Sequence, residues 1–244
     1  MTAAGRARHF GLAAAVVIIV LGAGLALAVT YGRAGSPGPG RQPSAPSAAP
    51  ESSGPQLPRP GLAGLRWDGY HGVQLPSSPA AGPHHIDNGL AWGFADTPLG
   101  ALLAALNIAV RANAQWGPDV FVPTIRDQVT GPGAAALLAS CQADYGQASQ
   151  AAHITGGRPL GTVSVTEEAF RWAGWSPAGA TVDLVSVGPG SQGVTIRAST
   201  RVEVVWSGGD WRVVAPPGGD WGNSAAALSS LAGYTAFPGQ GGGR

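Results

Sequence analysis

The sequence predicts an α+β fold that follows an apolar N-terminal segment: a transmembrane helix, then one domain in which helices precede an antiparallel sheet. Three observations support this prediction. Apolar residues repeat at helical spacing between residues 98 and 150, and apolar and polar residues alternate after residue 160. The composition also changes at residue 66, where a basic, proline-rich front gives way to an acidic, aromatic part.

The charge distribution separates these two parts and excludes some functions. Residues 1–66 hold six Arg and one acidic residue, whereas residues 67–244 hold eight Arg, twelve acidic residues and all eight Trp. The net charge of +1 leaves no basic face for phosphates, so we expect no nucleic-acid partner. The single cysteine excludes an intrachain disulfide and any cysteine-rich metal site.

Residues 10–31 form an apolar run of 22 residues without a charge. As a helix this run is about 33 Å long, enough to span a hydrocarbon core of about 30 Å. A cleaved signal peptide is the alternative, because Ala26-Leu27-Ala28 resembles a cleavage site. The flanking arginines nearly balance; the short N-terminal tail and the stretch after the run favour a cytoplasmic N-terminus and an extracytoplasmic C-terminal domain. The predicted partner of this segment is the lipid bilayer.

Residues 32–66 are rich in Pro, Gly and Ser, and this composition predicts a disordered linker that holds a domain away from the membrane. The predicted organisation is therefore a cytoplasmic tail (1–9), a transmembrane helix (10–31), this linker (32–66), a globular domain (67–238) and a flexible tail (239–244).

Three helices are expected in the first half of the domain. Thr97 is an N-cap and Pro98 a first helical residue, and this helix stops at Gly117-Pro118. A second helix follows Pro123, and a third spans about residues 134–150.

Strands are expected after residue 160. Residues 194–206 alternate with one apolar and one mostly polar face, residues 207–210 form a turn, and residues 211–214 return as the partner strand. Residues 181–187 form another strand, and residues 162–175 a less regular, bulged one. The sequence GPGSQG at 188–193 matches a dinucleotide-binding pattern, but strands on both sides predict a hairpin loop instead.

Candidate chemical groups are few and scattered. His84, His85 and Asp87 form the only histidine cluster, and adjacent residues of an extended segment point to opposite sides, so we expect no metal site. One of Glu167 and Glu168 could act as a general base in a pocket if its pKa were raised, although a solvated or paired carboxylate is the expected state. Cys141 lies on an apolar helix side and is expected to be a buried thiol. The sequence thus predicts no catalytic, cofactor-binding or metal-binding residue.

The tryptophans are the remaining feature. The five considered are Trp92, Trp172, Trp175, Trp206 and Trp211, and most of them are expected in the core. An exposed aromatic cluster would instead indicate a partner or glycan surface.

The final hairpin carries a resemblance to a known fold. Val204, Trp206, Gly209, Asp210, Trp211, Arg212 and Val213 resemble the last hairpin of the nuclear-transport-factor-2-like fold, a bent sheet wrapped against helices into a cone. This resemblance implies a cone-shaped domain with a curved antiparallel sheet. Enzymes of that fold use an Asp, His or Tyr set that has no match here.

The overall layout is similar to the single-pass core components of conjugative and type IV secretion machines. The stretches 93–101, 115–118 and 237–239 resemble an uncharacterised actinobacterial membrane-protein family of integrative and conjugative elements. These resemblances imply a non-catalytic envelope protein that self-associates or docks other envelope proteins of a transfer complex, with no cofactor. The alternatives are an extracytoplasmic small-molecule or cell-wall binding module and, third, a tethered enzyme.

Overall fold

The computed structural model describes residues 57–190 and 194–239. The predicted segments 1–9 and 10–31, most of the linker 32–66, and all but the first residue of the tail 239–244 lie outside these ranges. In the described ranges no helix is long and apolar enough to cross a membrane.

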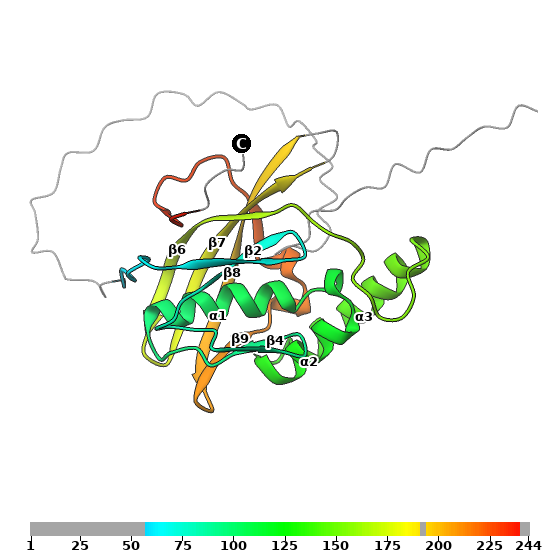
Figure 1. Cartoon of the computed structure of the whole chain (residues 1–244), viewed down its shortest axis with the longest axis horizontal. Helices are drawn as coiled ribbons and strands as arrows, with labels where there is room; N and C mark the ends of the chain where they lie inside the picture. The colour runs from blue at the N-terminus through cyan, green and yellow to red at the C-terminus, as the bar shows by residue number, and fades with distance from the viewer. Residues whose placement is uncertain (1–56, 191–193, 240–244) are drawn as a thin grey trace, which may run out of the picture.

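Strands form most of the regular structure, and one large mixed sheet dominates it (Figure 1). Its seven strands are β11 (Thr235–Ala236), β6 (Thr166–Ser176), β7 (Gly179–Pro189), β8 (Thr195–Ser207), β9 (Asp210–Val214) and β5 (Val129–Thr130) in that order, with β10 (Ala225–Ala227) also paired to β8. Two hairpins lie outside this sheet: β1 (Arg66–Tyr70) with β2 (Val73–Ser77), and β3 (His85–Asp87) with β4 (Leu90–Trp92).

The predicted order of elements is wrong. The four strands of these two hairpins precede the first helix, so the helices do not come first as the nuclear-transport-factor-2-like expectation required. The large sheet is also mixed, because β5 runs parallel to β9. The early strands were missed because they are three to five residues long and too short to show a clear alternation.

The four strands expected after residue 160 are confirmed. They correspond to β6, β7, β8 and β9, which pair antiparallel in sequence order. β6 carries two register shifts, as expected for a bulged strand. β7 and β8 pair as far as Pro189 and Thr195, so the GPGSQG segment connects antiparallel strands and no helix follows it.

Helix α1 (Pro98–Arg111) forms the centre of the core. The Thr97 hydroxyl accepts a hydrogen bond from the Gly100 amide at 3.1 Å, which confirms the predicted cap. The large sheet packs on one side of α1 and the hairpin strands β2 and β4 pack on others (Figure 1). Every residue from Gly100 to Arg111 is therefore buried, which explains why this helix is almost wholly apolar.

Two polar residues of α1, Asn107 and Arg111, are buried with it. The Asn107 amide donates hydrogen bonds to the carbonyl oxygens of Pro76 (3.1 Å) and Leu103 (3.0 Å). The Arg111 guanidinium donates to Asn107 Oδ1 at 2.8 Å and lies 4.5 Å from the centroid of the Tyr70 ring. Both side chains thus join the helix to the first hairpin.

Helices α2 (Pro118–Gln128) and α3 (Ala134–Ala151) pack against each other at one end of the molecule (Figure 1). The third helix confirms its predicted range. The second begins six residues earlier than the sequence suggested, because Gly117-Pro118 both ends the short helix η1 (Ala114–Trp116) and starts α2, with Pro118 at its first position.

Candidate functional site

A cavity of about 740 Å³ lies between α3, η1 and two C-terminal turns, η3 (Pro217–Gly219) and η4 (Trp221–Ser224). Its lining combines apolar side chains with a few polar ones: Asn113, Ala114, Gln115, Leu137, Ser140, Cys141, Ala143, Asp144, Gln147, Ala148, Ala151, Leu160, Gly219, Asp220 and Trp221. The cavity size falls within the range of small-molecule sites, about 300–1,000 Å³.

The C-terminal turns are held tightly against the helices. Trp221 is buried, and its indole N–H donates to the Ala112 carbonyl at 3.1 Å, just beyond the end of α1. Gly219 has a φ of +70° and lies so close to α3 that a Cβ atom there would stand 2.3 Å from the Leu137 nitrogen. Asp220 begins η4 by accepting a hydrogen bond from the Gly222 amide at 2.7 Å. These contacts fix Asp220 at the cavity.

The cavity carries two carboxylates, Asp144 from α3 and Asp220 from the C-terminal turn, and no Arg or His belongs to its described lining. Partial burial raises the pKa of Asp144, and the negative charge of Asp220 raises it further. The two carboxyl groups are therefore close enough to repel each other. Their repulsion would be relieved by a positive charge between them.

Asn113 is the most deeply buried polar residue of the cavity lining, with 2 % of its surface exposed. Its side-chain oxygen accepts a hydrogen bond from the Gln115 amide at 3.0 Å and so caps η1. Within the described ranges, no protein group accepts a hydrogen bond from its side-chain nitrogen. That amide is a hydrogen-bond donor available to a bound molecule.

Cys141 lines the cavity as a buried thiol, in agreement with the prediction. Burial chiefly, together with the charge of Asp144, raises its pKa to about 12. Its Sγ atom lies 3.9 Å from the Ala112 carbonyl, to which it donates. The thiol is protonated at neutral pH and is a poor nucleophile in this state.

The two candidate general bases lie outside this cavity lining. Glu167 is fully buried, and the Ser186 hydroxyl donates to its two carboxylate oxygens at 3.0 and 2.9 Å. Burial raises the pKa of Glu167 to about 7, while the Ser186 hydrogen bond opposes that increase. Glu168 accepts hydrogen bonds from the Arg197 guanidinium at 2.5 and 2.9 Å, so it is a paired carboxylate, as expected from the sequence.

The histidine cluster lies on the exposed strand β3 and at the residue just before it. The His85 ring stacks on Trp92 with centroids 5.2 Å apart, and Asp87 accepts a hydrogen bond from the neighbouring Asn88. Within residues 57–190 and 194–239, no group of three or more His, Cys, Asp or Glu side chains is arranged to hold a metal ion.

The tryptophans form part of the core rather than one exposed cluster. Trp172, Trp211 and Trp221 are buried in the main core, and Trp67, Trp175 and Trp206 pack partly buried against it. Trp116 is buried in a second apolar cluster. The rings of Trp175 and Trp206 each contact Trp211, at 6.0 and 5.4 Å between centroids. The expectation that most of them are core residues is confirmed.

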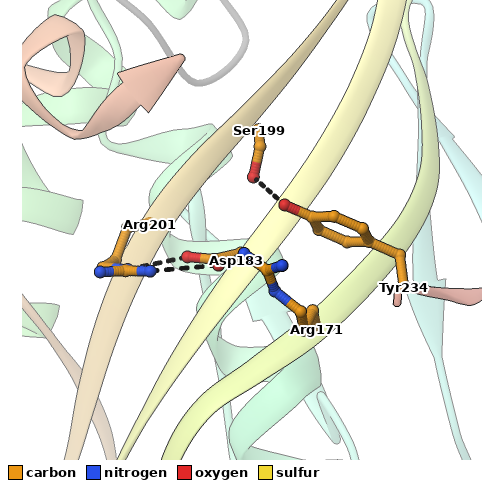
Figure 2. A network of polar contacts seen from close by, with 5 residues as sticks. All are labelled: Arg171, Asp183, Ser199, Arg201 and Tyr234. Carbon is orange, nitrogen blue, oxygen red and sulfur yellow. Dashed lines mark hydrogen bonds and ion pairs between the residues drawn. The ribbon is translucent and has the colours of Figure 1, made fainter. Parts of the chain in front are cut away.

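A polar network links the middle of the large sheet to the C-terminal segment (Figure 2). Asp183 on β7 accepts hydrogen bonds from Arg171 on β6 (2.7 Å) and from Arg201 on β8 (2.8 and 3.2 Å). The Arg171 guanidinium lies 4.5 Å from the Tyr234 ring centroid, and the Tyr234 hydroxyl is 3.1 Å from that of Ser199. The arginines hold the pKa of Asp183 below its usual value despite burial. The network as a whole holds the C-terminal segment on the sheet, through the contacts of Tyr234 with Arg171 and Ser199.

The cavity could not be predicted from the sequence, because its residues come from segments that are far apart in the chain. One local signal was present: Asp220-Trp221-Gly222 follows the pattern of an aspartate that caps a short turn.

Comparison with known proteins gives one match. The model of a family described as a domain of unknown function (DUF8175) matches residues 28–236. No curated protein and no solved structure matches the chain.

Proposed function

The chain belongs to the DUF8175 family, and we propose that it is a non-catalytic binding module that holds a small molecule, or a small group of a larger one, in the cavity between α3 and the C-terminal turns. The observation that carries this proposal is the cavity itself. It combines apolar walls with a few polar groups from separate elements, as ligand sites do.

The chemistry of the lining supports binding rather than catalysis. Its described titratable groups are two carboxylates and one thiol whose pKa is about 12. No histidine lies beside the thiol in this lining to activate it. The buried carboxyl group with a pKa near neutrality, Glu167, belongs to the sheet and not to this lining.

The sequence supports a position for this module. We place it outside the cytoplasm, anchored through the apolar segment 10–31 and separated from the bilayer by the segment 32–66. The same organisation favours a second candidate function, a docking component of a conjugative transfer or secretion assembly. Crosslinking of the full-length protein in its native membrane tests this candidate, which predicts crosslinks to itself or to other envelope proteins.

The binding function can be tested with a cavity-filling variant. In Ala148→Trp the indole occupies space in the cavity, whereas Ala135→Trp adds the same ring to an exposed position of the same helix. Ligand-detected NMR on the full-length protein would screen a fragment set of amines, carboxylic acids, neutral amides and sugars. We expect at least one class to bind wild type and Ala135→Trp and to be lost from Ala148→Trp.

Two outcomes would contradict the binding function. In the first, no fragment of any charge binds the wild-type protein. In the second, every fragment that binds retains its signal in Ala148→Trp, which would place the binding elsewhere on the molecule.

A further inference from the structure

We infer that the ligand group held in this cavity is a primary ammonium next to a hydrogen-bond acceptor on an apolar body, as in an α-amino amide. This inference rests on the proposed function and names the chemical class that the cavity selects. Three features of the lining carry it: its charge, its buried donor and its apolar walls.

The charge of the described lining is wholly negative. Asp144 and Asp220 contribute two carboxylates, and no cationic side chain belongs to the lining to neutralise them. Partial burial chiefly, and also the charge of Asp220, raise the pKa of Asp144, so its negative charge is costly when no cation lies beside it. A bound anion would add to this repulsion, whereas an ammonium ion would form charge-assisted hydrogen bonds with carboxylate oxygens.

The buried donor is the side-chain amide nitrogen of Asn113. Its own oxygen is committed to the Gln115 amide, which fixes the orientation of the group. In the described ranges this nitrogen donates to no protein group, so a ligand that accepts from it gains a hydrogen bond that other ligands lack. A cation alone cannot accept a hydrogen bond. The ligand therefore needs a carbonyl or similar acceptor in addition to its ammonium.

The walls of the cavity limit the rest of the ligand. Leu137 and Trp221 are buried, and Leu160 and several alanines complete an apolar lining. A strongly hydrated inorganic cation would leave these walls without a contact, and a group of three or more metal-ligating side chains is not found in the described residues. An organic cation with an aliphatic side chain fits both the charged and the apolar parts.

The test uses three compounds of matched shape and isothermal titration of the full-length protein. Leucinamide carries the ammonium, the carbonyl and an isobutyl group. 4-Methylpentanamide lacks the ammonium, and isopentylamine lacks the carboxamide. We expect the affinity for leucinamide to be at least about tenfold higher than that for 4-methylpentanamide, and also higher than that for isopentylamine.

Variants identify the groups responsible. Asp144→Asn and Asp220→Asn are each expected to weaken leucinamide binding about tenfold or more. Asparagine caps a helix as well as aspartate does, so Asp220→Asn keeps the turn. Glu203→Gln removes one carboxylate from the exposed part of β8, outside the cavity lining, and should leave the affinity unchanged.

Leucinamide represents both a free amino compound and the amino terminus of a peptide. The peptide Leu-Ala-Ala-amide separates these two sources. Tighter binding of the peptide than of leucinamide identifies a peptide terminus, and equal or weaker binding identifies a free amino compound; both support the shared chemistry.

The inference and the proposed function fail in different ways. Equal binding of 4-methylpentanamide and leucinamide, with loss of both in Ala148→Trp, would overturn the ammonium inference and leave the binding function intact. Unchanged leucinamide affinity in Asp144→Asn and Asp220→Asn would also overturn the inference. Binding that persists in Ala148→Trp would overturn both.

Discussion

Replacing Glu167 by glutamine is expected to raise the free energy of unfolding by about 3 kcal/mol at about pH 8 and to change it little at acidic pH. Glu167 is fully buried, and its pKa is raised from 4.5 to about 7. At about 1.4 kcal/mol per pH unit, this difference corresponds to about 3 kcal/mol. Glutamine has the same shape, carries no charge and still accepts the hydrogen bond from Ser186.

The sign follows from proton binding. Between pH 4.5 and about 7 the folded protein holds a proton on Glu167 that the unfolded chain has released. The wild-type protein therefore loses stability as the pH rises through this interval, and the loss stays constant above it. Glu167→Gln has no proton to lose, so its stability should be flatter across the same interval.

Glu168→Gln is the matched control for this prediction. Glu168 is the next residue, but it is partly exposed and paired with Arg197. Its substitution should cost less than about 1 kcal/mol, because the ion pair is partly exposed to solvent. Urea unfolding followed by tryptophan fluorescence measures all three proteins. If the free energy of unfolding of Glu167→Gln depended on pH in the same way as that of wild type, burial of Glu167 would not penalise its charge.

Replacing Gly219 by alanine is expected to cost about 3 kcal/mol of stability and to weaken binding in the cavity about tenfold or more. The added Cβ would meet α3 backbone atoms at 2.3 Å (Leu137 nitrogen) and 2.5 Å (Ala136 carbonyl carbon). Backbone atoms cannot relieve the clash by adopting another rotamer, as a side chain could, so η3 must move away from α3. Asp220 and Trp221 follow directly in the chain and would move with it.

Gly218→Ala separates this clash from ordinary backbone strain. Gly218 also has a positive φ, +68°, but the nearest atom to an added Cβ is the Asn223 amide nitrogen at 3.4 Å. We expect this variant to lose only about 1 kcal/mol and to keep its binding. Chemical denaturation and isothermal titration with leucinamide measure both quantities. Equal losses of stability and of leucinamide affinity in Gly218→Ala and Gly219→Ala would refute the role of the close approach of Gly219 to α3.

Some elements of the fold could be predicted from short stretches of sequence, because their structure depends on neighbouring residues. The start of α1 follows from Thr97-Pro98, and strand β8 follows from its alternation. The start of α2 was misplaced because Gly117-Pro118 is a strong stop signal and an equally strong start signal, and the sequence alone does not separate the two.

The remaining features depend on contacts between distant segments. The burial of Asn107 and Arg111 comes from the first hairpin, which covers the polar side of α1. The cavity brings together Asn113, Asp144 and Asp220 from three segments without a fixed spacing. Of the two neighbouring glutamates, the bulge in β6 leaves Glu167 buried and Glu168 partly exposed, which a strict alternation alone does not assign.

The most direct test of the binding cavity is the NMR signal of the Trp221 indole N–H during a titration of the full-length protein with leucinamide. Trp221 lines the cavity and donates to Ala112, whereas Trp206 lies on β8 outside the cavity lining. Loss of one indole signal in Trp221→Phe, and of another in Trp206→Phe, assigns the two. We predict that the Trp221 signal shifts with saturation while the Trp206 signal stays in place. Saturable shifts of Trp206 with an unchanged Trp221 signal would contradict binding in this cavity.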